Sequence, residues 1–137
     1  MNLALLASAS PAIIIHLIFA IAAFVLGGIQ LASRKGTRTH KLLGYVWVAA
    51  MVVICLTSFK IKEVMPQGMF GGYSPIHLLS VFVLFQLARG IYFAKKKNIK
   101  KHRKCMLFTY IGGLVIAGVF TFMPGRFLFK VLIEPWF

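Results

Sequence analysis

The chain has 137 residues, 60% of them apolar, and its formal net charge is +14 because 16 lysines and arginines stand against two acids. This composition excludes an ordinary water-soluble domain, since the basic residues lie between apolar runs that no aqueous surface could display. The charge is therefore better explained by membrane topology than by nucleic-acid binding, and we expect no nucleic-acid partner.

Four apolar segments follow one another along the chain, at about residues 11–32, 42–59, 76–94 and 105–123. Each is long enough to cross the hydrocarbon core, for which about 20 residues suffice. Each must be helical, because unpaired backbone groups are costly in lipid. The predicted fold class is an all-α integral membrane protein, a four-transmembrane-helix bundle forming one domain over residues 1–137. The apolar stretch 127–137 is too short to span the bilayer, and we expect it to lie along the interface.

Positive charge is concentrated in the two loops that follow the first and third segments. The first loop carries four basic residues and the second carries seven, and neither contains an acid. Because cytoplasmic loops carry an excess of lysine and arginine, both loops are predicted to be cytoplasmic and both termini to lie outside. The predicted location is the cytoplasmic membrane of a bacterium, with the lipid bilayer as the first partner.

The first and third segments begin alike. Ser10-Pro11 and Ser74-Pro75 each supply an N-cap residue followed by a proline at the first helical position. We therefore expect two helical hairpins that are copies of each other and point the same way, a parallel repeat.

The four histidines of the chain follow this repeat. His16 and His40 are 24 residues apart, and His77 and His102 are 25 residues apart. With a rise of about 1.5 Å per residue, His16 and His77 share a level near the outer face, and His40 and His102 begin their helices at the cytoplasmic face. Ionisable groups inside a membrane usually mark a functional site, and two facing imidazoles suit haem iron. This pattern predicts haem b, one for each histidine pair.

Small residues are expected where a helix passes a haem. Eleven residues, or about three turns, after a histidine lie Gly27, Ala88 and Gly113, with Met51 as the exception on the second helix. We expect Gly27 and Ala88 to border the cytoplasmic haem and Gly113 to border the outer one.

Two arginines are candidates for anion binding. Arg89 lies within the third apolar segment, and Arg126 follows the fourth in the sequence Pro124-Gly125-Arg126. Either could contact a haem propionate, and Arg126 could instead meet an anionic substrate. The alternative for both is contact with lipid phosphate.

Several other functions stay open at this point. The histidines could hold a single haem or metal at the outer pair, or could be interfacial basic residues of a structural subunit that carries no cofactor. A transporter or assembly protein that uses the histidines for metal or protons is a further alternative, although the segments lack the acids common in transporters. There is no nucleotide-binding glycine motif and no pair of carboxylates, so any enzymatic activity would rest on a cofactor or on the histidines.

Short motifs spread over nearly the whole chain suggest a family. They are His16, Thr39-His40-Lys41 with Gly44 and Trp47, Ser74-Pro75-Ile76-His77, Asn98-Ile99 before His102-Arg103, and Ala117-Gly118 before Pro124-Gly125-Arg126. With them the chain resembles the small bacterial four-helix membrane proteins that are grouped as a domain of unknown function.

The histidine arrangement also resembles the core of cytochrome b561, a four-helix dihaem unit in which alternate helices pair to ligate a haem near each face. The resemblance implies that His16 pairs with His77 and His40 with His102, and that the protein transfers electrons across the membrane. As donor or acceptor it implies a quinol, an ascorbate-like reductant, a ferric chelate or a redox protein, hence a membrane oxidoreductase. The chain departs from that family in lacking flanking helices and in placing its inner histidines at the membrane edge.

Overall fold

The computed structural model describes residues 2–61 and 75–136, and the described residues form helices joined by short turns. In chain order the elements are α1 (Leu3–Ala7), α2 (Pro11–Ala32), α3 (Arg38–Lys60), α4 (Pro75–Lys95), α5 (Ile99–Tyr110), the π-helix η1 (Ile111–Ile116), α6 (Ala117–Thr121), the π-helix η2 (Phe129–Ile133) and the 3₁₀-helix η3 (Glu134–Trp136).

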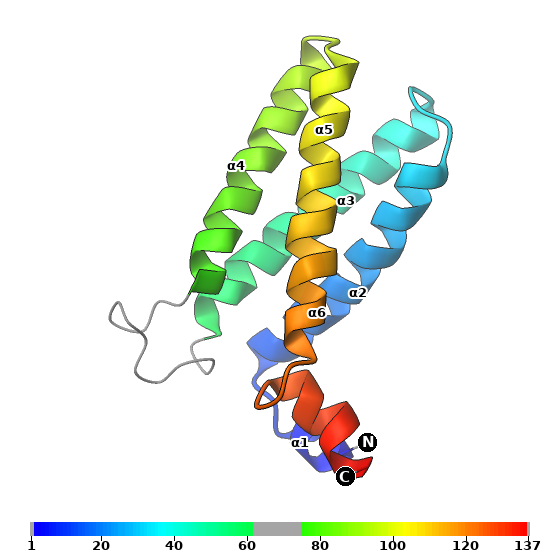
Figure 1. The fold of residues 1–137 in the computed structure, drawn as a ribbon. Helices are drawn as coiled ribbons and strands as arrows, with labels where there is room; N and C mark the ends of the chain where they lie inside the picture. Colours follow the sequence, from blue (N-terminus) through cyan, green and yellow to red (C-terminus); the bar gives the residue numbers. More distant parts are fainter. Residues whose placement is uncertain (1, 62–74, 137) are drawn as a thin grey trace.

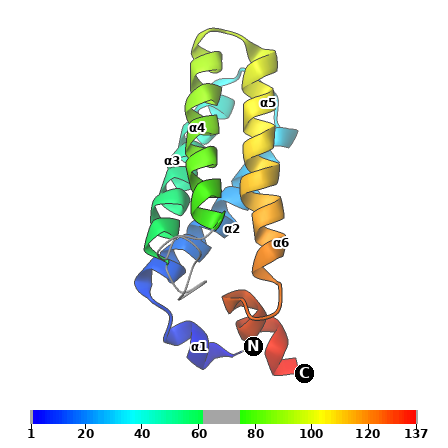
Figure 2. The same cartoon turned by 60° about the vertical axis from the view of Figure 1, so that its left-hand side comes forward.

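Within the described residues, four helices are long and apolar enough to cross a membrane: α2, α3, α4 and the continuous stretch Ile99–Thr121 made by α5, η1 and α6. The hairpins α2–α3 and α4–α5 both turn at the same end, and α1 and the C-terminal segment lie at the other (Figures 1 and 2). We call the first the basic end and the second the terminal end. The predicted four-helix membrane bundle, with its two hairpins pointing the same way, is confirmed.

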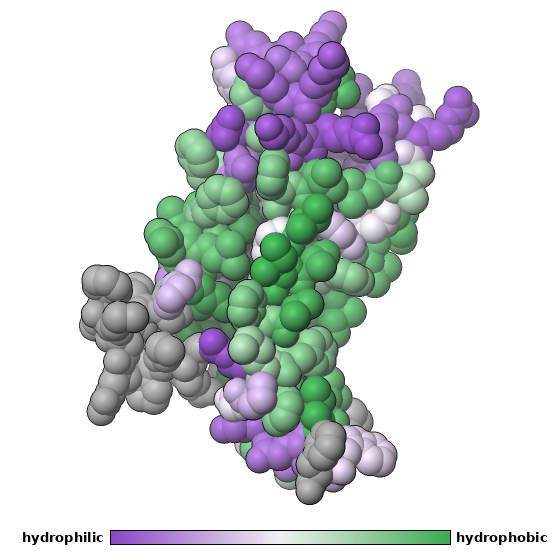
Figure 3. Space-filling view, in the orientation of Figure 1, coloured by the Kyte–Doolittle hydropathy of each residue, from purple (hydrophilic) through white to green (hydrophobic). Residues whose placement is uncertain are grey.

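The surface of the bundle is that of a membrane protein. Figure 3 shows hydrophilic residues at both ends and a hydrophobic zone between them. Large apolar side chains in this zone are open to the surroundings, among them Leu78 at 74% and Val119 at 65% exposure. Apolar exposure on this scale is suited to lipid and not to water.

The observed helix bounds extend the predicted ones at the basic end. The first segment matches its prediction, but α3 begins at Arg38 instead of about 42, and the fourth span begins at Ile99 instead of about 105. The Thr37 hydroxyl accepts from the His40 N–H at 3.0 Å, and Asn98 Oδ1 accepts from the Lys101 N–H at 3.3 Å. These caps start each helix in its polar first turn, which a search for apolar residues leaves out.

The two predicted serine N-caps are followed by helices, but no side-chain cap is seen at Ser10. Helix α2 begins at Pro11 as expected, but Ser10 makes no side-chain hydrogen bond to the helix. Ser74 lies outside the described residues, while α4 does begin at Pro75. The proline marks the start of both helices, because its fixed φ suits the first helical position and its missing N–H costs nothing there.

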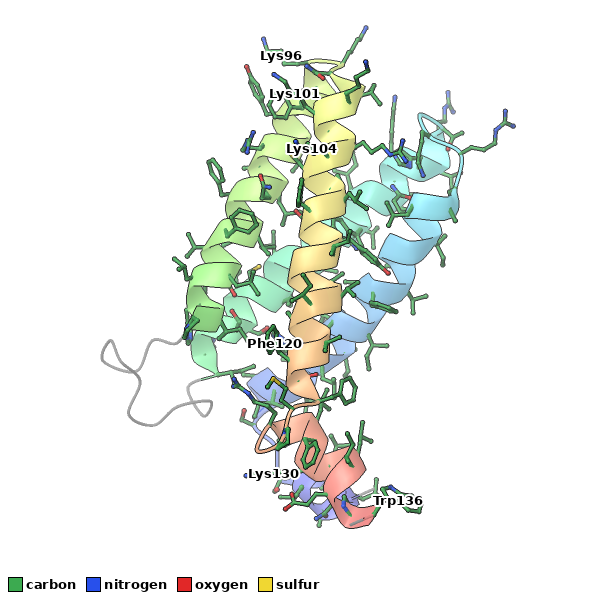
Figure 4. The ribbon with its side chains drawn as sticks, viewed as in Figure 1. Lys96, Lys101, Lys104, Phe120, Lys130 and Trp136 are labelled. Carbon is green, nitrogen blue, oxygen red and sulfur yellow. The ribbon has the colours of Figure 1, made fainter. Side chains whose placement is uncertain are left out.

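The C-terminal segment is helical and closes the terminal end. It forms η2 and η3, and the Asn2 N–H donates to the Val131 carbonyl at 2.8 Å. Val131 is buried where the segment meets α1. Figure 4 shows Lys130 and Trp136 on this segment, at the end opposite Lys96. The two ends of the described chain therefore support each other.

Helix α3 supplies most of the core. Its buried residues Trp47, Ala50, Met51, Ile54 and Cys55 form one cluster with Ala23 of α2, Val83 and Leu87 of α4, and Leu114 of η1. The hydroxyl groups of Ser58 on α3 and Ser80 on α4 form a hydrogen bond inside this core, with their oxygens 2.6 Å apart. The core holds the four spans together, and it leaves the basic ends of the two hairpins apart (Figure 1).

Candidate functional site

A cavity of about 410 Å³ opens between the two hairpins at the basic end. All four spans contribute to its lining, and the residues used below are Gly27 and Gln30 of α2, Lys35 of the first loop, His40, Lys41, Gly44 and Trp47 of α3, Ala94 and Lys95 of α4, and His102, Arg103, Met106 and Tyr110 of α5. Its volume lies within the range of ligand sites, about 300–1,000 Å³. The lining includes His40 of one hairpin and His102 of the other, the two histidines that the sequence places at the same level.

Two aromatic side chains cross α2 at the inner end of the cavity. Trp47 Nε1 donates to the Ala23 carbonyl at 2.9 Å, and the Tyr110 hydroxyl donates to the Phe24 carbonyl at 3.1 Å. Both rings pass over Gly27, where an added Cβ would lie 2.5 Å from ring carbons of Tyr110 and 2.8 Å from Trp47 Nε1. Gly27 is therefore small because these two rings need its space.

His40 is positioned by a glutamine of the neighbouring helix. Gln30 Nε2 donates to the His40 carbonyl at 2.5 Å, and Gly44 lets the amide approach, since a Cβ there would lie 3.1 Å from Gln30 Nε2. His40 Nδ1 and Gln30 Oε1 are both buried and make no hydrogen bond to the described residues. A buried polar atom without a partner costs about 1–3 kcal/mol, which is a reason to look for a ligand here.

His102 is fixed from the opposite hairpin. Its Nδ1 lies 2.8 Å from the Gly90 carbonyl of α4. Because a carbonyl only accepts, Nδ1 must carry the proton in the neutral ring, which leaves the lone pair on Nε2. A backbone carbonyl that orients imidazole in this way is the usual support of a metal-ligating histidine. Gly90 also contacts the tip of Met106 so closely that a Cβ there would displace it.

Positive charge surrounds the mouth of the cavity. Lys35, Lys41, Lys95 and Arg103 belong to its lining, and none of the described lining residues carries a carboxylate. The site therefore combines an apolar interior with cations at its entrance. A ligand with an apolar body and an anionic edge would match this arrangement.

His16 and His77, the histidines nearer the terminal end, each contact α3. His16 Nδ1 lies 3.1 Å from the Ile54 carbonyl and 3.0 Å from the Thr57 hydroxyl. The carbonyl again requires the proton on Nδ1 and leaves Nε2 with its lone pair. His77 is buried, and its ring centre lies 5.7 Å from that of Phe59. The pairing of His16 with His77 stays a prediction.

The small residues expected beside haem have different surroundings. Gly27 belongs to the cavity lining. Ala88 is exposed and does not belong to it, and the lining residues of α4 are Ile91, Ala94 and Lys95. A Cβ on Gly113 would lie 3.0 Å from Val83 and 3.4 Å from Met51. Helix packing in the core therefore explains Gly113. The prediction for Ala88 is wrong because it assumes that a histidine and the residue eleven positions later both face one common cavity.

The two arginines lie away from this cavity. Arg89 points to the other side of the α4–α5 hairpin, where its Nη1 donates to Gln86 Oε1 at 3.2 Å. This placement removes it as a propionate partner of a haem between His40 and His102, because it lines a separate groove. Arg126 lies three residues before η2 at the terminal end, and its carbonyl accepts from the Lys130 N–H at 3.0 Å. Its proposed role toward an outer haem or a substrate stays a prediction.

Gln30 and Tyr110 are site residues that the sequence analysis did not single out. Both are polar residues within apolar segments, a signal that could have found them. This signal does not predict which face of its helix each side chain lies on. Only the packed bundle shows that both side chains reach the same cavity as Trp47.

The described lining of the cavity includes two imidazoles, those of His40 and His102. In residues 2–61 and 75–136, no group of three or more histidine, cysteine or acidic side chains is placed to hold a metal ion. A bare zinc site usually takes three or four protein ligands, whereas a porphyrin brings four nitrogens and needs only two axial ligands from the protein. The histidines of the cavity therefore match haem better than a bare ion.

Comparison with known proteins identifies a family whose description names no activity. The family model described as "Predicted membrane protein (DUF2306)" matches residues 13–133, which is most of the chain. The chain matches no curated protein and no solved structure.

Proposed function

The chain belongs to this family of predicted membrane proteins, and we propose that it is a b-type cytochrome that binds haem between His40 and His102 and transfers electrons across the membrane. The observation that carries the proposal is the cavity with one histidine from each hairpin. A histidine on each side of an apolar cavity is the arrangement that bis-histidine haem needs.

The local chemistry of the cavity supports the fit. His102 is held by Gly90 with its Nε2 lone pair available, and the buried Nδ1 of His40 has no hydrogen-bond partner among the described residues. Lys41 and Arg103 at the entrance would neutralise propionates. Trp47 and Tyr110 would cover the inner edge and keep water out.

Each of these residues has a distinct task in the proposed function. Gln30 fixes the His40 backbone, Gly90 fixes the His102 ring, and Gly27 makes room for the two aromatic rings. Bound haem would supply reversible one-electron chemistry, while the protein supplies ligands, burial and charge. Because the cations favour the state with more negative charge, they would raise the reduction potential of the site.

The outer histidines complete the proposal. His16 and His77 would hold a second haem near the terminal end, and the two sites would then form a path for electrons across the bilayer. The orientation of His16 by the Ile54 carbonyl, which resembles that of His102 by Gly90, supports this part. The positive-inside rule assigns the basic end to the cytoplasm of a bacterium. A quinol, a small redox substrate or a redox protein would be the partner at either face.

The test is an optical spectrum of the purified protein, oxidised and then dithionite-reduced, with a pyridine haemochrome count per chain. The wild-type protein, expressed with sufficient haem, should show sharp reduced α and Soret bands and about two haems per chain, the stoichiometry of two bis-histidine sites. His102→Ala and His40→Ala should each remove the haem of the basic end, and His16→Ala that of the terminal end.

Lys101→Ala is the matched control for His102→Ala, because Lys101 is the neighbouring residue on α5 but lies outside the cavity. It should keep the full spectrum. A colourless wild-type protein would overturn the cytochrome proposal and favour metal or proton handling, or a structural role. A wild-type count of one haem, lost in His16→Ala but kept in His102→Ala, would refute the site at the basic end.

A further inference from the structure

A second hollow lies on the opposite side of the α4–α5 hairpin. It has a volume of about 390 Å³, and six of its lining residues are Gln86, Arg89 and Phe93 of α4 and Lys101, Lys104 and Phe108 of α5. It shares no lining residue with the histidine cavity. The groove and the histidine cavity are therefore separate sites, and a ligand of the groove is different from the one proposed above.

Three cations converge on this groove over aromatic rings. The Arg89 guanidinium lies 5.7 Å and Lys101 Nζ lies 5.3 Å from the centre of the Phe93 ring, so one ring carries two cations. Lys104 Nζ lies 5.8 Å from the Phe108 ring centre. Rings hold such cations in place by cation–π attraction, although the cations repel one another.

No acid balances this charge within the described chain. The described residues include one carboxylate side chain, Glu134, and it lies in η3 at the terminal end. Three cations held close together without an acidic partner form a site for an anion. Gln86 adds a polar group at the base of the groove, where its Oε1 already accepts from Arg89.

The depth and surroundings of the groove identify the source of the anion. Arg89 lies six residues before the end of α4 and Lys104 five residues after the start of α5, which is about 8–9 Å below the basic loops. Figure 4 shows Lys101 near the basic end and Lys104 further along α5. The rings beside them, Phe85 at 59% and Phe108 at 53% exposure, are open to the hydrocarbon region. This is the level at which lipid phosphates meet acyl chains.

We infer that the α4–α5 groove binds an anionic phospholipid, with the headgroup phosphate against Arg89, Lys101 and Lys104 and the acyl chains along the exposed phenylalanines. Basic sites between transmembrane helices on the cytoplasmic side are where such headgroups bind. The inference does not depend on haem, because the groove and the histidine cavity lie on different faces of the hairpin.

The test counts bound lipid by native mass spectrometry on the delipidated full-length protein, titrated with phosphatidylglycerol, cardiolipin or phosphatidylcholine. The wild-type protein should bind the two anionic lipids more tightly than phosphatidylcholine. Because each cation near the surface contributes about fivefold in affinity, Arg89→Gln/Lys101→Gln/Lys104→Gln should weaken anionic lipid binding by about 100-fold.

The control variant, Lys96→Gln/Lys97→Gln/Lys100→Gln, removes the same charge from the same hairpin but leaves the groove intact. It should keep most of the lipid preference. Equal losses in both variants would show attraction to general surface charge and would overturn the inference, as would no loss in either. Displacement of the lipid by millimolar inorganic phosphate would also overturn it, because the site would then take a soluble anion. If the triple variant does not fold, Arg89→Gln alone gives the same readout with a loss of about fivefold.

Discussion

Gly27 has no side chain, and two aromatic rings meet in the space that this leaves: the Trp47 ring of α3 and the Tyr110 ring of α5. Both rings donate to carbonyls of α2 one turn earlier, at Ala23 and Phe24. One glycine thus lets two other helices reach the backbone of the same turn. From the sequence, Gly27 is predicted to be small for contact with haem, whereas in the structure its small size makes room for these two rings.

Gly27→Ala should destabilise the bundle, because the new Cβ would lie 2.5 Å from the Tyr110 ring and 2.8 Å from Trp47 Nε1. Overpacking of this kind costs about 1–3 kcal/mol, against a gain of about 1 kcal/mol in helix propensity. The measurement is the free energy of unfolding in mixed detergent micelles.

Gly28→Ala is the control for that substitution. It gains the same helix propensity, but its new Cβ would lie 3.5 Å from the Tyr110 hydroxyl, which is an ordinary van der Waals contact. It should be neutral or slightly stabilised. Equal stability of the two variants would show that the rings do not fill the space over Gly27.

At the scale of the helices, the turn between α4 and α5 contains a residue, Lys97, in an unusual backbone conformation. Lys97 has φ +57°, in the left-handed region. The Asn98 N–H donates to the Phe93 carbonyl at 2.9 Å and the Lys97 N–H to the Ala94 carbonyl at 3.0 Å. These two bonds form a Schellman motif, in which the position of Lys97 is usually a glycine.

Lys97→Gly should therefore stabilise the protein. A side chain in the left-handed region costs roughly 1–2 kcal/mol, and glycine removes this cost while keeping both hydrogen bonds. The expected gain in the free energy of unfolding is about 1 kcal/mol, measured by the same denaturation. Lys96→Gly, at the preceding residue, should give no gain; if it stabilised as much as Lys97→Gly, the conformation of Lys97 would not be the cause.

The fourth span contains a π-helix, which the sequence pattern does not predict. Residues Ile111–Ile116 form a π-helix between α5 and α6. A π-turn has wider i→i+5 bonding and often occurs at functional sites. Apolar content predicts a span here but not the pitch of the helix, because hydropathy reports how apolar the side chains are and not which backbone groups bond to each other.

For the whole molecule, the charge distribution predicts one orientation. Both basic loops lie at one end and both chain ends lie at the other (Figure 1). In cells, a membrane-impermeant maleimide should label Ser8→Cys from outside and should label Lys96→Cys only after permeabilisation. The native Cys55 and Cys105 are buried and should give little background. Labelling of Lys96→Cys in intact cells would show the reverse orientation.

The sequence by itself determined the four spans, the shared end of the basic loops and the two levels of the histidines, because hydropathy, charge and rise per residue act along one helix at a time. Only the tertiary structure decided which helix faces meet. It placed His40 and His102 in one cavity, turned Arg89 to the opposite groove and left Ala88 exposed. The physical reason is that the direction of a side chain depends on how the hairpins pack and where they separate, and residues far apart in the chain set both.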